Sequence, residues 1–321
     1  MNLASNTLPA SMLRPHYRAA AQPYMRPAAH DAGARKRQFD QLDVQANAPQ
    51  SVCWAFMQPR ARPCFTVELL VGLRRMQRWV RQEYERRENT GASQIKYVVL
   101  GSEADGIFNL GGDLGLFTEC IRTGNREALA NYADLCIDVV YDAAVAMQLP
   151  IVTIALVQGD ALGGGFEAAL ACNVIIAERS AKFGFPEVLF NLFPGMGAYN
   201  LLSRRLDTRR AEEMILSGRL YSAEEMQALG LVDLIVEDGL GRDAVLDYVA
   251  RNSRRHPAER AVYHARQLLH PVSLNDLRAL SELWVETALA LTEADLRRME
   301  RLLKAQNRRW LGVVPQAVAA E

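Results

Sequence analysis

Short apolar segments alternate with helical segments through the middle of this chain of 321 residues, and this alternation limits the possible folds more than any other feature. Residues 97–101, 151–157 and 174–177 are apolar runs with the length of buried strands. Residues 126–147 and 164–171 separate these runs and have helical patterns. Strands that alternate with helices pair in parallel, because each helix carries the chain back across the sheet. The sequence therefore predicts an α/β fold with a parallel sheet.

The region before this core adds one strand and one long helix. Residues 51–57 read as a strand that ends at Gln58-Pro59. Thr66 is a suitable helix N-cap, and the apolar residues that follow it recur at helical spacing to about Arg87.

The region after the core begins with a capped helix and a strand. Ser222 and Glu225 have the spacing of a capping box, and Gly230 lies at the expected C′ position. A strand is predicted at 231–236. After about residue 240 the pattern is almost entirely helical, with predicted helices at 243–252, 258–269 and 274–306.

These patterns divide the chain into three regions. Residues 1–35 are rich in Ala, Pro and small polar residues, which predicts a loosely ordered extension. Residues 36–240 form the α/β core. Residues 241–321 form a C-terminal helical region that we expect to pack on the core or on a neighbouring subunit.

Two glycine-rich loops follow predicted strands. One is Gly111-Gly112, where Asp113 is also suited to N-cap the next helix, and the other runs through Gly163, Gly164 and Gly165 into the helix at 164–171. Each loop alone is consistent with a plain turn. Glycine lets a ligand approach the backbone closely, and the N-terminus of a helix favours an anionic oxygen. Together the loops predict two amide groups that hold the oxyanion of a thioester.

Two glutamates accompany these loops. Glu167 lies among apolar residues at the start of the predicted helix, and Glu187 follows Pro186. Taken singly, either glutamate is consistent with a surface residue in a first helical turn. A carboxyl group in apolar surroundings has a raised pKa, which suits it to proton transfer. A pair of such groups supplies one base and one acid, as the addition or removal of water across a carbon–carbon bond requires.

The composition limits which classes of partner and which cellular compartment are expected for the protein. Lys and Arg number 37, and so do Asp and Glu, so the net charge does not point to nucleic acid or to an anionic membrane. No apolar stretch approaches the ~20 residues that a membrane span needs, and residues 1–27 lack the apolar run of a signal peptide. The five cysteines form no C-x-x-C motif, which favours a reduced, cytoplasmic setting.

Common cofactor and nucleophile motifs are missing from the sequence. The glycines at 195 and 197 lack the third glycine of a dinucleotide loop, and no phosphate-binding G-x-x-x-x-G-K-[ST] loop occurs. All five histidines lie outside the central region, so we expect neither a Ser-His-Asp triad nor a histidine metal site. The predicted chemistry needs no cofactor.

An ordered set of motifs resembles one known superfamily. The motifs are Phe108-Asn109-Leu110-Gly111-Gly112-Asp113, Gly159 to Glu167, Phe183-Gly184-Phe185-Pro186-Glu187, Phe193-Pro194-Gly195-Met196-Gly197, Leu216-Ser217-Gly218-Arg219 and Gly230-Leu231-Val232-Asp233. Over roughly residues 50 to 250 the chain resembles the crotonase (enoyl-CoA hydratase/isomerase) superfamily. The resemblance implies a spiral of ββα units with a C-terminal helical layer, assembled as a homo-oligomer (a trimer or hexamer).

The resemblance also implies roles for particular residues. Gly112 and Gly164 match the two amides of the family's oxyanion hole, and Glu167 and Glu187 match its acid/base glutamates. Met196, Trp284 and Leu302 are implied to line the acyl pocket.

Further segments resemble a narrower group, the diffusible-signal-factor synthases. These segments are Trp54-Ala55-Phe56-Met57-Gln58-Pro59, Arg62-Pro63-Cys64-Phe65-Thr66 and the long helical tail. The resemblance implies a dehydratase and thioesterase that makes a cis-2-unsaturated fatty acid for quorum sensing from a 3-hydroxyacyl group on acyl carrier protein. Hydratases often place a basic residue after the first oxyanion motif to meet the CoA phosphates, but Asp113 and Leu114 occupy this place.

Two alternatives stay open at this point. A conventional enoyl-CoA hydratase would release no free acid and would prefer CoA substrates. A regulatory protein that binds a partner such as a sensor histidine kinase would not need either glutamate. We expect Glu187 to remove the C2 proton and Glu167 to protonate the leaving hydroxyl, although the sequence does not fix this order.

Overall fold

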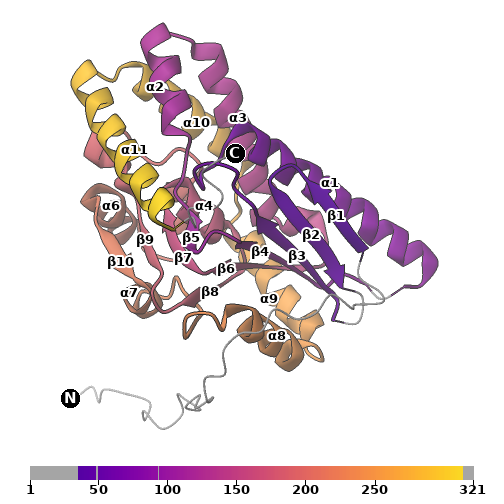
Figure 1. The fold of residues 1–321 in the computed structure, drawn as a ribbon. Coiled ribbons are helices and arrows are strands. Elements are labelled where there is room, and N and C mark those ends of the chain that lie inside the picture. The colour runs from indigo at the N-terminus through magenta and orange to yellow at the C-terminus, as the bar shows by residue number, and fades with distance from the viewer. Residues whose placement is uncertain (1–34, 48–49, 93, 314–321) are drawn as a thin grey trace, which may run out of the picture. The chain divides into compact units, whose positions relative to one another are not determined.

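The computed structural model describes residues 35–47, 50–92 and 94–313, and within them the chain has the predicted α/β fold with a parallel sheet and a C-terminal helical region (Figure 1). The described strands form a seven-stranded sheet in the order β1-β2-β3-β4-β6-β8-β11. β1 to β3 pair antiparallel, and all later neighbours pair in parallel. Its strands are β1 (Arg35–Phe39), β2 (Leu42–Asn47), β3 (Val52–Met57), β4 (Tyr97–Ser102), β6 (Val152–Val157), β8 (Val174–Glu178) and β11 (Leu234–Val236).

A smaller sheet carries the glycine loops. In the described residues it has the order β10-β9-β7-β5. Its strands are β5 (Gly106–Asn109), β7 (Gly159–Leu162), β9 (Lys182–Gly184) and β10 (Leu220–Ser222). β5, β7 and β9 are parallel neighbours, so their carboxyl ends, and the loops that follow them, meet at one edge.

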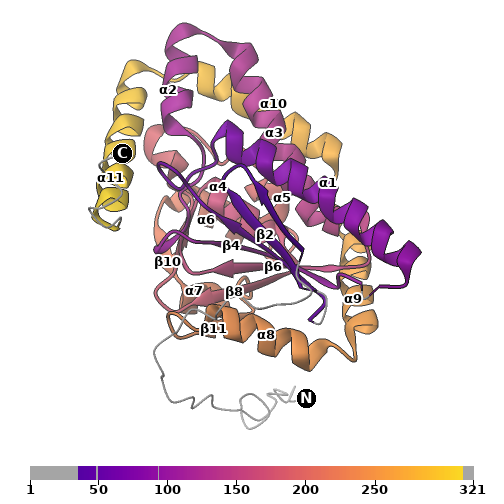
Figure 2. The same ribbon diagram turned by 45° about the vertical axis from the view of Figure 1, so that its right-hand side comes forward.

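Helices cover both faces of the large sheet. On one face α1 (Val67–Thr90), α3 (Arg126–Ala144) and α4 (Gly164–Ala171) share the largest apolar core with the strands. On the opposite face α8 (Gly241–Asn252) and α9 (His256–Leu269) cover the sheet (Figure 2).

The remaining helices pack against α3, against the small sheet or against other helices. They are α2 (Leu114–Thr123), α5 (Ala198–Leu202), α6 (Thr208–Ser217), α7 (Ala223–Ala228), α10 (Leu274–Leu289) and α11 (Glu293–Val313), with a 3-10 turn at Pro186–Phe190.

The predicted helix caps are confirmed. The side chains of Thr66, Asp113 and Ser222 each accept a hydrogen bond from the first turn of the helix that follows. Ser222 and Glu225 form the full capping box, and Gly230 has a φ of +75° after α7. These short-range signals placed the helix starts correctly.

The predicted helix at 126–147 is too long. It ends at Ala144, because the next turn, Ala146, Met147 and Gln148, has φ values of +49°, +54° and +58°. Such left-handed backbone cannot continue a right-handed helix. The Met147 carbonyl accepts a hydrogen bond of 3.0 Å from Arg81 Nε, which holds this turn between α3 and β6.

The predicted helix at 274–306 is two helices. α10 ends at Leu289 and α11 begins at Glu293. Thr292 and Asp295 cap α11, since Thr292 Oγ1 donates to Asp295 Oδ2 at 2.6 Å and accepts from the Asp295 amide. The Thr-x-x-Asp spacing signals this start. The predicted strand at 231–236 is also shorter, since β11 begins at Leu234.

The predicted extension, residues 1–35, lies outside the described residues except for Arg35, which begins β1. The five cysteines are buried with free thiols. Within the residues that the structure describes, no helix is long and apolar enough to cross a membrane.

Candidate active site

The two glycine loops lie against each other. β5 leads into Gly111 and Gly112, and its parallel neighbour β7 leads into Gly163 and Gly164. Gly111 has a φ of +92°, and a Cβ added to it would lie 3.1 Å from the Gly164 amide nitrogen and 2.9 Å from the Leu162 carbonyl oxygen. Only glycine allows this approach.

The amides of Gly112 and Gly164 are available to a ligand. Among the hydrogen bonds between described residues, neither amide is a donor. Gly164 is the first residue of α4, where amides have no partner within the helix. Tyr132 fixes the other loop, because its hydroxyl donates to the Phe65 carbonyl at 2.6 Å and accepts from the Asp113 amide at 3.1 Å.

The Glu167 side chain is buried and held by backbone amides. Its Oε1 atom accepts hydrogen bonds from the amides of Met196 at 2.7 Å and Ala198 at 2.8 Å. Burial, and next the charge of Glu187, raise the pKa of Glu167 well above its ordinary value, and the two amides only partly oppose this. Because both amides bind Oε1, the proton of the neutral acid is left to Oε2.

Glu187 occupies the 3-10 turn at Pro186–Phe190. Its carboxylate packs against Gly163, where an added Cβ would lie 2.2 Å from Oε1. The residue as a whole is half-buried, but Oε2 is fully buried and has no hydrogen-bond partner among the described residues. This burial raises the pKa of Glu187 to about 7.

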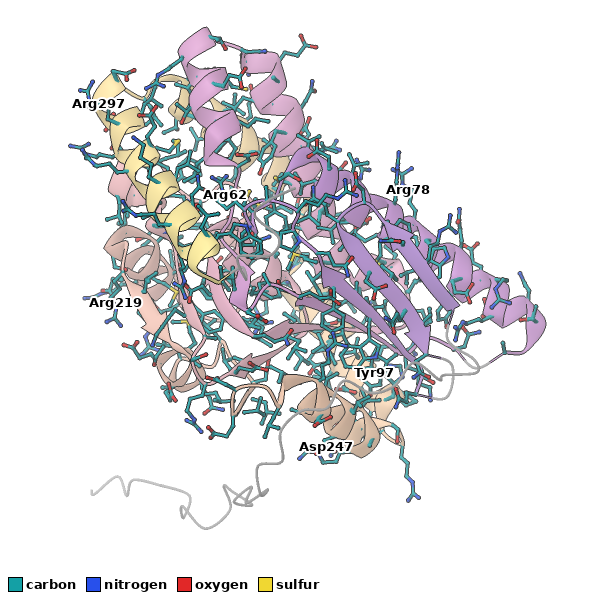
Figure 3. The ribbon with its side chains drawn as sticks, in the orientation of Figure 1. Arg62, Arg78, Tyr97, Arg219, Asp247 and Arg297 are labelled. Carbon is teal, nitrogen blue, oxygen red and sulfur yellow. The ribbon has the colours of Figure 1, made fainter. Side chains whose placement is uncertain are left out.

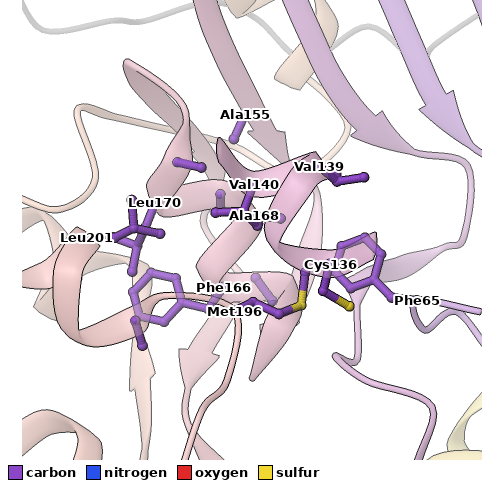
Figure 4. Packing of buried hydrophobic residues seen from close by; sticks show 14 of the residues in the cluster. Phe65, Cys136, Val139, Val140, Ala155, Phe166, Ala168, Leu170, Met196 and Leu201 are labelled. Atoms are coloured by element: carbon purple, nitrogen blue, oxygen red, sulfur yellow. The ribbon is translucent and has the colours of Figure 1, made fainter. Parts of the chain in front are cut away.

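One pocket of about 560 Å³, a volume that includes the solvent at its open mouth, brings the predicted residues together. All of them line it: Gly112, Gly164, Glu167, Glu187, Met196, Trp284 and Leu302. Figure 4 shows Met196, Phe65 and Cys136 in the buried cluster around α4, and Met196 Sδ and the Phe65 ring both approach Gly164. The carboxyl groups and the free amides therefore face one mostly apolar space.

Sequence reasoning missed much of the cavity wall. Phe117 packs with its ring against Gly112, and contacts Tyr132 and Trp284 edge to face at 5.2 Å and 5.0 Å between ring centroids. Phe117 and Tyr132 belong to the apolar faces of α2 and α3, but nothing local shows that these faces meet at the site. Gln306 of α11 also lines the cavity.

Arg62, labelled in Figure 3, lies beside the first glycine loop. It forms an ion pair with Asp113 at 2.9 Å. The same Asp113 caps α2, so the residue that follows the first oxyanion motif is engaged in local structure. Across the described ranges, no group of three or more His, Cys, Asp or Glu side chains is arranged to hold a metal ion.

The geometry suits proton transfer next to a stabilised oxyanion. Two carboxyl groups with raised pKa supply an acid and a base near neutral pH. Two amides from separate loops are fixed before any ligand binds, which is the condition for strong stabilisation of developing negative charge.

Comparisons with known proteins agree with the fold. The mouse mitochondrial methylglutaconyl-CoA hydratase is 34% identical over 151 residues, which cover 47% of this chain and 46% of that protein. An enoyl-CoA hydratase structure from Bacillus anthracis has a TM-score of 0.60 at 25% identity and covers 83% of this chain and 96% of its own. Pseudomonas aeruginosa DspI has a TM-score of 0.57 at 24% identity and covers 78% and 87%.

The chain spans about half, or less, of the length of curated relatives such as the mouse hydratase and the Arabidopsis thaliana multifunctional protein MFP2. The family model described as enoyl-CoA hydratase/isomerase matches residues 86–279, which include both glycine loops and both glutamates. The chain therefore belongs to the enoyl-CoA hydratase/isomerase family.

Proposed function

We propose that this protein synthesises a cis-2-unsaturated fatty acid signal, by dehydrating a 3-hydroxyacyl group on acyl carrier protein and then hydrolysing the thioester. The observation that carries the proposal is the cavity in which Glu167 and Glu187, both with raised pKa, face the free amides of Gly112 and Gly164. The narrower resemblance, at residues 54–59 and 62–66, supports the signal product.

The thioester oxygen binds between the amides of Gly112 and Gly164. These hydrogen bonds stabilise the enolate that forms when the C2 proton leaves, and loss of one such donor costs on the order of 100-fold in rate. The apolar wall, which includes Met196, Trp284 and Leu302, holds the acyl chain.

Glu187 is the base and Glu167 the acid. Glu187, with a pKa of about 7 and an unpartnered Oε2, takes the C2 proton. Glu167, whose pKa burial and the charge of Glu187 raise well above its ordinary value, gives the Oε2 proton to the C3 hydroxyl, which leaves as water. The C2–C3 double bond forms, and proton exchange with solvent returns both groups to their starting states.

Hydrolysis uses the same donors. A water molecule that a glutamate deprotonates attacks the thioester carbonyl, and the oxyanion of the tetrahedral intermediate lies between the two amides. The C–S bond breaks, the carrier thiol takes a proton, and the free acid is released.

A conventional enoyl-CoA hydratase is the second candidate, because several curated relatives are named as CoA hydratases. Incubation with 3-hydroxydodecanoyl acyl carrier protein and, separately, its CoA ester, followed by mass spectrometry, distinguishes the two. Free cis-2-enoic acid from the carrier-protein substrate supports the signal synthase. Reversible hydration of the CoA ester without free acid supports the hydratase. Glu167→Gln and Glu187→Gln are the matched controls, and normal product from either contradicts its assigned role.

The proposal also includes the cellular compartment, the oligomeric state and a protein partner. We place the protein in the cytoplasm as a homo-oligomer, a trimer or hexamer, which analytical ultracentrifugation tests. Binding of a sensor histidine kinase, if it is a second role, persists in the Glu167→Gln/Glu187→Gln double variant, because that role needs no acid or base.

A further inference from the structure

Asp160 is a buried carboxylate that the reaction does not use. It lies in β7, four residues before Gly164, and does not line the cavity. Burial raises its pKa, while Arg309 and, less strongly, Lys182 lower it. Arg309 of α11, 149 positions away in the sequence, is its ion-pair partner. A buried charge needs a partner, so Asp160 ties a strand of the site to the C-terminal helix.

The same face of α11 holds the other strand of the site. Gln306 Nε2 donates to the Leu110 carbonyl at 3.3 Å, immediately before Gly111 and Gly112. Residues three positions apart lie on one face of a helix, so Gln306 and Arg309 point to the same side. Trp310 adds an apolar contact with the small cluster of Ala104, Ile107, Leu110 and Leu162.

The two strands that these contacts join are short. The loop after β5 is also held by the Phe65 amide, which donates to the Gly111 carbonyl at 2.8 Å, and by Tyr132, and the Gly163 amide after β7 donates to the Gly184 carbonyl at 2.8 Å. β5 and β7 are four residues each, and their register is irregular between Ile107 and Asn109. They carry the Gly112 and Gly164 amides at their ends. The separation of the two amides therefore depends on what holds the ends of this short strand pair together.

We propose that Arg309 and Gln306 of α11 are positioning residues, which clamp the β5 and β7 ends and so set the separation of the Gly112 and Gly164 amides. This inference rests on the proposed oxyanion hole. A displacement of about 1 Å at a reacting group lowers the rate by about 100-fold, so a loosened clamp weakens stabilisation of the oxyanion while the glutamates stay in place.

The test measures the oxyanion hole separately from the acid and base. S-acetoacetyl-pantetheine has an acidic C2 proton, and its bound enolate absorbs in the near ultraviolet. Its short acyl group does not need the Trp284 and Leu302 wall. We expect Arg309→Met to reduce enolate formation at least tenfold, and to lower kcat for dehydration by 10- to 100-fold, with KM changed less than threefold.

The matched control is Arg308→Met, an exposed position on the same helix. Figure 3 shows Arg297 of the same helix pointing away from the body of the protein. We expect Arg308→Met to match wild type. The Asp160→Asn/Arg309→Met double variant removes the unpaired buried charge, and we expect it to recover part of the enolate signal. It also keeps the test valid if Arg309→Met alone does not fold.

The outcomes separate this inference from the proposed function. Full enolate formation in both the single and the double variant overturns the clamp, as does an equal loss in Arg308→Met or a loss confined to KM. If the wild type forms the enolate but releases no enoic acid, the proposed function is overturned. The comparison of Arg309→Met with wild type then still decides whether the clamp exists. No enolate in the wild type overturns both.

Discussion

The carboxylate of Glu187 lies directly on Gly163, so that a single methyl group at this glycine would come within 2.2 Å of Glu187 Oε1. Gly163 is also the N-cap of the helix whose first amide belongs to Gly164. One glycine therefore places an acid/base candidate beside an oxyanion donor.

Gly163→Ala should abolish turnover while leaving much of the fold intact. The new Cβ displaces Glu187, and the φ of +51° adds strain. Gly91→Ala is the control, because Gly91 has a similar φ of +67° with no atom within 4 Å of an added Cβ. We expect Gly91→Ala to lose about 1 kcal/mol from its left-handed backbone. Gly163 has a ψ of −125°, outside the left-handed region, so Gly163→Ala should lose more, and it alone should lose at least 100-fold in kcat. Equal kcat values in the two variants would contradict the contact.

Glu167→Gln and Glu167→Ala should differ in stability more than in activity. Glutamine keeps an oxygen that accepts from the Met196 and Ala198 amides, whereas alanine leaves both amides buried without a partner. We expect Glu167→Ala to lose about 2–4 kcal/mol more in the free energy of unfolding. Urea denaturation measures this difference, and both variants should lack dehydratase activity. A Glu167→Ala protein as stable as Glu167→Gln would show that the amides find other partners.

The pH dependence of kcat/KM should be bell-shaped. Glu187 acts when ionised, and its pKa is about 7, so the rate rises as the pH passes through about 7. Glu167 acts when protonated, and its pKa is raised well above its ordinary value, so the rate falls again once the pH passes that raised pKa. Initial rates between pH 5 and 10 test this. A profile that is already level at pH 5.5 excludes Glu187 as the base.

The stability of Glu187→Gln relative to wild type should depend on pH. The pKa of Glu187 rises from 4.5 to about 7 on folding, so the folded wild type binds more protons than the unfolded chain in this range. Wild-type stability therefore falls from about pH 4.5 to 7, and glutamine does not titrate. We expect the advantage of Glu187→Gln to grow to about 3 kcal/mol by pH 7 and to level off above it. Thermal unfolding at pH 4.5, 6 and 8 measures it, and a constant difference would argue for an ordinary pKa.

Trp284 should limit the length of the acyl chain. Its ring lies against Gly195, where an added Cβ would approach Trp284 Cδ1 within 2.5 Å, and it lines the cavity. Trp284→Ala should shift the preferred substrate to longer chains and cost about 3–5 kcal/mol of stability. Trp284→Phe keeps most of the ring volume and serves as the control. Competition among acyl thioesters of different length reads out the preference, and an unchanged order would place the acyl chain elsewhere.

Elements with strong local signals were predictable from the amino-acid sequence. Thr66, Asp113 and Ser222 predicted three helix starts correctly, because a cap interacts with backbone only two or three residues away. The strands β5, β7 and β9 were missed, since three or four residues are too few to show a periodic pattern. The left-handed turn at 146–148 was also missed, because no glycine marks it.

The residues of the candidate site, unlike their contacts, were predictable from the sequence. The sequence predicts the glycine loops, the two glutamates and, through the resemblance, the wall residues Met196, Trp284 and Leu302, and the pocket is lined by Gly112, Gly164, both glutamates and all three wall residues. Their roles stay predictions until the variants are measured.

The contacts that hold these groups come from segments far apart in the chain and could not be predicted from local patterns. Glu167 depends on amides 29 and 31 positions away, and Asp160 depends on Arg309, 149 positions away. Local patterns report the interactions of near neighbours in the chain. The pKa of a buried carboxyl group, in contrast, is set by whatever surrounds it, and here those surroundings come from distant segments that meet only when the chain folds.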